Sequence, residues 1–317
     1  MEKYFYNSND SLYDYIHYLT FIDEDDHLLC IGRFQYSNLV KEYIKIFEIN
    51  KKNLQKKELR LYINDKLSDT INSSIVHNFT MNKVGPNNYI ANAGRDRWLD
   101  TSMYNTNHDG GMYFFKGYRD NDTFYFSQHS LGITIKTGAK QTHPASNECF
   151  TPIISYINKY LIYSRYNIER GKRLVQIFSS PDGLNNWKLY NIVKIIDENN
   201  NLLKNTHYSI YLMTVCKFKD KYVSLLRFCK KSYGGETYHP LYTLYYAVSN
   251  DGITFKFQKK IGEIHFWPCY GYILENDKLN LFFYSAENGR NKNKKTIGKV
   301  IVDNDFNIKI INNFLHF

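Results

Sequence analysis

The sequence predicts a repeated β-unit, and five polar residues lie at the expected start of the first strand in its successive copies. They are Asp14, Asp109, Glu148, His207 and His265. The segments around them are largely apolar, so that acids at these places call for an explanation. Three carboxylates in one partly desolvated funnel would repel each other and split their pKa values, leaving one protonated and another ionised near neutrality. That division predicts glycosidic cleavage, which needs an acid for the leaving oxygen and a carboxylate that attacks or activates water.

The elements that must position these residues are indicated by a block of a polar turn followed by an apolar strand. Its copies span residues 26–34, 158–166, 220–228 and 277–284, with a more degenerate version at 111–117 and 123–127. The last three clear copies begin 62 and 57 residues apart. Strand repeats on a period of this length predict a β-propeller. If the block is the second strand of each blade, the preceding strand lines the central channel. The starts of these inner strands then converge at one mouth.

We therefore predict an all-β chain, with residues 1–317 forming a single five-bladed β-propeller of four-stranded antiparallel blades. The abundance of tyrosine (29) and phenylalanine (21) agrees with strand composition. The expected blades are approximately 12–66, 107–140, 146–191, 206–260 and 264–311. Residues 67–106 are expected to form a long connection, and connections of that length are often functional.

Two predicted outer strands end in matching Ser-x-Asp-Gly turns, which contain Asp182 and Asp251 and are followed by Trp187 and Phe255. In such a turn the aspartate accepts hydrogen bonds from backbone N–H groups, and the glycine takes a positive φ. The aromatic side chain packs the turn onto the sheet. We interpret the two aspartates as structural rather than catalytic.

The segments around Glu148 and Asp109 resemble two elements of the invertase (β-fructosidase) type of glycoside hydrolase. Residues 148–153, Glu-Cys-Phe-Thr-Pro-Ile, resemble the Glu-Cys element, and residues 108–114, His-Asp-Gly-Gly-Met-Tyr-Phe, resemble the Arg-Asp-Pro element. The resemblance implies that Glu148 is the general acid and that Asp109 stabilises the transition state. His108 stands where the family has an arginine, and blade one has no Asn-Asp-Pro signature.

The wider clan of five-bladed propellers includes arabinofuranosidases and β-xylosidases, with acids in the order Asp, Asp, Glu on blades one to three. Asp14, Asp109 and Glu148 follow that order, which implies that Asp14 is the nucleophile or base. Asp10 is a rival for this first position. The invertase comparison implies retention of configuration, and the xylosidase comparison implies inversion.

Five further residues are candidates for binding the substrate. Trp267 is a candidate sugar-stacking platform, with core packing as the equal alternative. Histidines can hold sugar hydroxyls, although lone ones are more often packed. Arg165 recurs with the blade, as Arg227 does, which also fits packing. The full set is His108, Arg165, His207, His265 and Trp267.

The formal net charge of +10 comes from lysines scattered through loops and favours acidic glycans over a dedicated nucleic-acid groove. No apolar leader or membrane span is apparent, and five cysteines without paired spacing suggest free thiols, so that a cytoplasmic location is expected. No cofactor is expected, and no metal site has recognisable spacing. A single calcium or sodium ion in the channel stays open.

The sequence thus predicts a glycoside hydrolase-like enzyme acting at the channel mouth through Asp14, Asp109 and Glu148. Two alternatives remain. One is a non-catalytic propeller that binds a glycan or a protein through the same mouth. The other is a transferase or phosphorylase that remodels glycans on the same scaffold.

Overall fold

The computed structural model describes the greater part of the chain, almost all of it as β-strand. The described residues are 13–36, 42–68, 77–94, 111–134, 153–156, 158–169, 172–230, 242–263, 266–286 and 295–316. These ranges contain no α-helix, and their helical structure is 3-10, as in the turn Asn205–His207. The predicted all-β class is therefore confirmed. The chain divides into two compact units, unit 1 with residues 1–93, 114–129 and 269–317, and unit 2 with residues 94–113 and 130–268.

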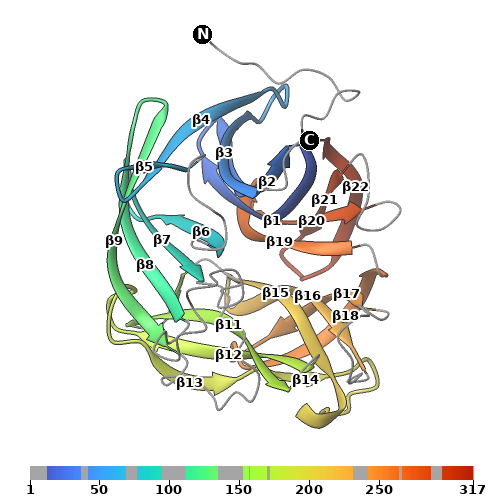
Figure 1. The fold of residues 1–317 in the computed structure, drawn as a ribbon. Coiled ribbons are helices and arrows are strands. Elements are labelled where there is room, and N and C mark those ends of the chain that lie inside the picture. Colours follow the sequence, from blue (N-terminus) through green and yellow to red (C-terminus); the bar gives the residue numbers. More distant parts are fainter. Residues whose placement is uncertain are drawn as a thin grey trace. The chain divides into compact units, whose positions relative to one another are not determined.

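Unit 1 contains three runs of four strands that neighbour one another in chain order (Figure 1). The first run is β1 (Tyr13–Glu24), β2 (His27–Tyr36), β3 (Glu42–Asn50) and β4 (Lys56–Ile63), with the short β5 (Lys66–Leu67) paired to β4. The second run is β6 (His77–Lys83), β7 (Asn88–Gly94), β8 (Gly111–Asp120) and β9 (Thr123–Thr134). The third run is β19 (Phe266–Glu275), β20 (Lys278–Ala286), β21 (Lys295–Val302) and β22 (Ile308–His316).

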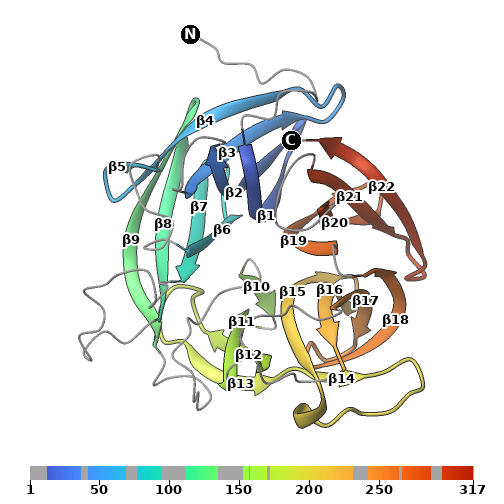
Figure 2. The same ribbon diagram turned by 45° about the vertical axis from the view of Figure 1, so that its right-hand side comes forward.

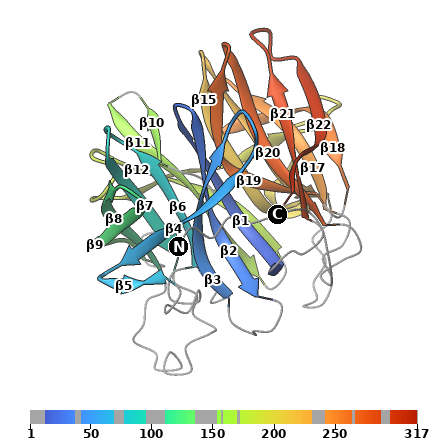
Figure 3. The same cartoon turned by 90° about the horizontal axis from the view of Figure 1, so that it is seen from above.

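Parallel strand pairs join these three runs into one sheet. β1 pairs with β19 through the partners Thr20 with Tyr270 and Phe21 with Gly271. At the other edge of the first run, β4 pairs with β9 over residues 60–63 and 123–126. In Figure 3 the third run, β19 to β22, is seen with its strands side by side. The first strands of two runs thus approach each other closely at Phe21 and Gly271.

Unit 2 contains two runs of four strands, in separate sheets (Figure 2). The first is β10 (Ile154–Tyr156), β11 (Lys159–Glu169), β12 (Lys172–Ser180) and β13 (Lys188–Ile192). The second is β15 (Ser209–Phe218), β16 (Lys221–Cys229), β17 (Thr243–Ser249) and β18 (Thr254–Gly262), with β14 (Lys194–Ile196) added in parallel to β18. All pairs within these runs are antiparallel.

One structural difference from the sequence prediction concerns residues 67–106. In place of one long connection, this stretch contains β6 and β7, which neighbour β8 and β9. Gly111–Asp120 is accordingly the third strand of its run rather than the first. The strands β6 and β7 carry buried polar residues, Asn78, Thr80 and Asn92, among their apolar ones. In β6 the apolar residues are only Phe79 and Met81, which makes the strand pattern short and weak.

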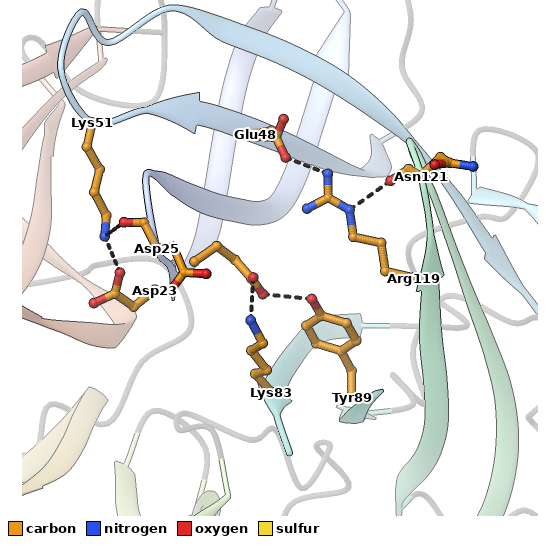
Figure 4. Close-up of polar contacts among 9 residues, drawn as sticks. Asp23, Asp25, Glu48, Lys51, Lys83, Tyr89, Arg119 and Asn121 are labelled. Carbon is orange, nitrogen blue, oxygen red and sulfur yellow. Dashed lines mark hydrogen bonds and ion pairs between the residues drawn. The ribbon is translucent and has the colours of Figure 1, made fainter. Parts of the chain in front are cut away.

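Side-chain pairs in unit 1 link the first run to the second (Figure 4). Lys83 Nζ and the Tyr89 hydroxyl donate hydrogen bonds to the two carboxylate oxygens of Glu24, at 2.5 and 2.7 Å. Arg119 Nη2 donates to Glu48 Oε2 at 2.5 Å. Burial, followed by the hydrogen bond to Glu24, raises the pKa of Tyr89 above its ordinary value. Glu24 ends β1, so that these links are placed far along the strand from Asp14.

The two Ser-x-Asp-Gly turns form as predicted. Asp182 Oδ1 accepts hydrogen bonds from the N–H groups of Leu184 and Asn185, at 2.9 and 2.7 Å. Asp251 Oδ1 accepts the equivalent bonds from residues 253 and 254, at 2.8 and 2.7 Å. The glycines at 183 and 252 have φ values of 75° and 70°. The aromatic residues that follow, Trp187 and Phe255, are buried.

We expect Asp182→Ala to lower the free energy of unfolding by about 1–2 kcal/mol at pH 7, because hydrogen bonds to a charged acceptor are lost. Burial alone would raise the pKa of Asp182, but the hydrogen bonds hold it well below its ordinary value. The ionised form therefore stabilises the fold above about pH 4, the unfolded pKa, and this contribution is lost as the pH falls toward the folded pKa. Urea unfolding from pH 7 to pH 3 measures it.

The matched control for this prediction is Asp220→Ala, since Asp220 is an exposed aspartate in a turn of the same unit. It should leave the unfolding free energy within about 0.5 kcal/mol of the parent. A difference between Asp182→Ala and the parent that stays constant down to pH 3 would contradict the assignment.

Four of the five cysteines are free and buried, namely Cys30, Cys216, Cys229 and Cys269. This agrees with the expectation of free thiols for that part of the chain. Burial raises the pKa of the Cys30, Cys216 and Cys269 thiols. These side chains act as small apolar groups of the core.

Candidate functional site

The predicted acids are placed unevenly by the structure. Asp10, Asp109 and Glu148 lie outside the described residues, as do the candidates His108 and His265. Asp14 is the second residue of β1, and its backbone follows the strand. The predicted position of Asp14 at the entry to a first strand is therefore confirmed, while the roles of all three acids remain predictions.

For Asp109 the reasoning from position is corrected. It was expected to precede the first strand of its run, but the strand that follows it, β8, is the third. The first strand of this run is β6, which contacts β1 and β2. In the strand order of the sheet, β8 is separated from β6 by β7.

Among the described candidate binding residues, Arg165 and Trp267 share a neighbour, the Tyr211 ring, and His207 is not part of that group. His207 is exposed, at the end of the 3-10 turn before β15. Arg165 of β11 and Trp267 of β19 belong to one group of side chains in unit 2. We call this group the arginine–aromatic cluster. It comprises Arg165, Arg173, Arg227, Tyr211, Tyr242 and Trp267.

The Tyr211 ring is at the centre of this cluster. The guanidinium carbons of Arg165, Arg173 and Arg227 lie 5.6, 4.4 and 5.5 Å from its centroid. The Trp267 ring meets the Tyr211 ring edge to face, at 5.4 Å between centroids and 83° between planes. The Tyr242 ring lies 5.5 Å from Tyr211. Three cations and three aromatic rings thus share one site.

Arg227 is the most deeply buried of the three arginines, at 1% exposure. Its guanidinium carbon lies 3.5 Å from the centroid of the Trp267 ring and 5.2 Å from that of Tyr242. Cation–π attraction is stronger when the pair is desolvated, up to about 2 kcal/mol. Arg227 therefore holds the indole in place.

The strand pattern explains why these residues meet. Tyr211 is near the start of β15, Arg173 near the start of β12, and Trp267 near the start of β19, while Arg227 is near the end of β16. Because β15 and β16 are antiparallel, the start of one lies beside the end of the other. The Ser209 hydroxyl accepts a hydrogen bond from the Arg173 N–H at 3.1 Å and donates to its carbonyl at 3.2 Å, which ties β12 to β15.

Tyr242 adds a polar edge to the cluster. Its hydroxyl and that of Ser209 are hydrogen-bonded at 3.1 Å. Burial raises the pKa of Tyr242, and the Ser209 hydrogen bond and the nearby Arg173 charge offset part of that rise. The phenol is therefore protonated at neutral pH and available for hydrogen bonding.

Sequence reasoning identified two members of the cluster and missed four. Arg227 was considered as a packing residue, and Arg173, Tyr211 and Tyr242 were not singled out. A signal was present in the repeated block, whose arginines are Arg33, Arg165 and Arg227. In unit 1 the Arg33 guanidinium likewise lies over an aromatic ring, that of Tyr18, at 5.3 Å. The repeat thus encodes an arginine that packs on an aromatic residue of a first strand.

A second polar group lies in the core of unit 1. Thr20, Asn78, Thr80 and Asn92 are at most 1% exposed, and Thr80 Oγ1 donates to Asn92 Oδ1 at 2.9 Å. Among the residues that the structure describes, none is hydrogen-bonded to the side-chain amide of Asn78 or to the hydroxyl of Thr20. Buried groups of this kind are typical sites for ordered water.

Within the described residues, no three histidine, cysteine, aspartate or glutamate side chains are grouped so that they could hold a metal ion. A search of the same part of the chain for a helix of membrane-spanning length and apolarity finds none.

Comparison with known proteins identifies the fold. No protein-family model matches the chain, and no curated protein is significantly similar in sequence. Among solved structures, a GH43_1 enzyme from Xanthomonas citri is 10% identical with a TM-score of 0.59, and the match covers 94% of this chain and 92% of that one. The RS223 β-xylosidase is 11% identical with a TM-score of 0.58, covering 93% and 95%.

A GH32 β-fructofuranosidase from Bombyx mori is also similar, at 10% identity and a TM-score of 0.59, covering 95% of this chain and 63% of that one. These proteins belong to the two groups that the sequence motifs resemble. The likeness extends over nearly the whole chain at low identity, and it therefore shows the fold. The chain therefore has the β-propeller fold of these GH43 and GH32 glycoside hydrolases.

Proposed function

We propose that the chain is a five-bladed β-propeller that acts as a glycoside hydrolase. The five runs of four strands are its blades, with β6 to β9 as the second. This assignment places Asp14 in the first strand of blade one and Glu148 just before the first strand of blade three, β10. The fold likeness to hydrolases carries the proposal.

In this proposal Glu148 is the general acid that protonates the leaving oxygen, and Asp14 is the nucleophile or base. Asp109, which precedes the third strand of blade two in the sequence, stabilises the transition state. The division of labour follows from the chemistry, since an acetal oxygen is a poor leaving group unless it is protonated. His108, His207 and His265 are proposed to contact sugar hydroxyls.

The arginine–aromatic cluster supports carbohydrate as the substrate class. Sugar rings present apolar C–H faces that pack on aromatic rings, and polar groups around a pocket fix their orientation. Trp267 is half-buried, and we propose it as the stacking platform. Related structures contain xylose, xylotriose and sucrose.

A non-catalytic glycan-binding propeller is the second candidate. The observation that favours it is the position of Asp109, which precedes a third strand and not a first one. The position of Asp109 in the strand order then differs from the one that the enzyme pattern requires.

The test is hydrolysis by the purified full chain of a panel of 4-nitrophenyl xylosides, arabinofuranosides and uronides, together with xylotriose and sucrose. We expect release of nitrophenol or monosaccharide from at least one member. NMR of the first-formed product then distinguishes retention from inversion. Calorimetric binding without any product release would replace the hydrolase by the binding propeller, and absence of both would overturn carbohydrate function.

A further inference from the structure

We propose that the arginine–aromatic cluster binds the carboxylate of an acidic sugar, so that the ligand of this protein is a uronic-acid-containing glycan. This inference rests on the proposed carbohydrate function and specifies its substrate class. It concerns side chains of unit 2 alone.

The concentration of positive charge is the first observation. Three guanidinium groups surround one tyrosine ring, with their central carbons 4.4 to 5.6 Å from its centroid. A neutral pentose or hexose needs hydrogen-bond donors and acceptors in mixed order, which serine, asparagine or histidine supply. Arginine offers donors and a permanent positive charge. Arg173, the half-buried one of the three, is placed to meet a ligand with a negative charge.

The distribution of exposure is the second observation. Arg165, Arg227, Tyr211 and Tyr242 are buried, at 1 to 8% exposure. Arg173 and Trp267 are half-buried. Arg173 and Trp267 are therefore the members of the cluster that solvent reaches most. A carboxylate on a sugar ring matches this pair, because its C–H face can pack on the indole while the charged group meets the guanidinium.

Arg173 is the arginine of the cluster that can donate to such a ligand. Its guanidinium carbon lies 4.4 Å from the centroid of the Tyr211 ring, and a guanidinium carries several N–H donors in a planar fork. A planar carboxylate can accept two of them side by side, which is the strongest arrangement for this pair.

Electrostatics acts in the same direction. An ion pair between Arg173 and a carboxylate is stronger at a half-buried position than in bulk water, because the local dielectric is lower. The net charge of +10 would also increase the rate of encounter with a polyanionic glycan.

The experiment is a calorimetric comparison of trigalacturonate with its methyl ester, which has the same ring stereochemistry and lacks the charge. For the parent protein at low salt we expect the acid to bind at least about tenfold more tightly than the ester. This preference should decrease as salt is raised, because a partly exposed ion pair is screened.

Arg173→Gln is the diagnostic variant. It should weaken binding of the acid about tenfold or more and leave binding of the ester nearly unchanged. Arg173→Lys keeps the charge without the paired donors and should fall between the two. Arg60→Gln is the matched control, since Arg60 is exposed on β4 of unit 1, and it should leave both affinities as in the parent. Thermal unfolding of each variant checks that the fold is kept.

Each outcome decides the inference separately from the proposed function. Equal binding of acid and ester by the parent, or equal losses in Arg173→Gln and Arg60→Gln, overturns the acidic-sugar inference and leaves the hydrolase proposal standing. Hydrolysis of neutral glycosides without affinity for uronides has the same meaning. Selective binding of trigalacturonate without hydrolysis of any glycoside supports the inference and overturns the hydrolase.

Discussion

Replacement of Glu148 by glutamine is expected to lower kcat for an alkyl glycoside by about 10²–10⁴-fold, because the amide cannot transfer a proton to the leaving oxygen. The effect should depend on the leaving group. With a 2,4-dinitrophenyl glycoside the leaving group is 2,4-dinitrophenolate, a stable anion that needs no protonation. The rate of the first step, cleavage of the glycosidic bond, should therefore fall little for this substrate. KM should change less than kcat, since the lost interaction is made mainly in the transition state.

The matched control for this variant is Glu198→Gln, which makes the same substitution at an exposed glutamate of the same unit. It should retain the activity of the parent on both substrates. Full activity of Glu148→Gln on the alkyl glycoside would refute the general-acid assignment. An equal loss on both leaving groups would also contradict it, because a general acid matters in proportion to the basicity of the leaving oxygen.

The second large effect is expected at Gly271, where β19 approaches β1. Its φ is +76°, and a Cβ atom there would lie 2.0 Å from the Phe21 carbonyl oxygen. The oxygen belongs to the backbone of a paired strand, so that it cannot move aside without breaking the parallel pairing of β1 with β19. We expect Gly271→Ala to lower the free energy of unfolding by about 4 kcal/mol or more, from steric overlap together with a positive φ.

Urea unfolding monitored by tryptophan fluorescence measures this loss, and Gly85→Ala is its control. A Cβ at Gly85 would have its nearest contact at 3.4 Å, on the Asn88 side chain, which is an ordinary separation. That variant should lie within about 1 kcal/mol of the parent. A Gly271→Ala protein as stable as Gly85→Ala would show that β1 and β19 are not so closely paired.

The local features of this chain could be predicted from the sequence alone. The all-β class follows from residue composition and alternation, and the Ser-x-Asp-Gly turns at 180–183 and 249–252 follow from side chains that bond to their own backbone. The likeness to invertase- and xylosidase-type hydrolases was carried by short motifs around Glu148 and Asp109. The structural comparison bears it out at the level of the fold.

The tertiary structure alone decided which strands are neighbours and which side chains meet. β6 was missed because its polar residues are buried on a strand that packs against β1 and β2, and such burial has no local signature. Arg173 was missed for a similar reason, since its partner Tyr211 is 38 positions away in the chain. The arginine–aromatic cluster exists because residues of five strands, β11, β12, β15, β16 and β19, come together. Such long-range strand pairing depends on the whole sheet rather than on any one segment.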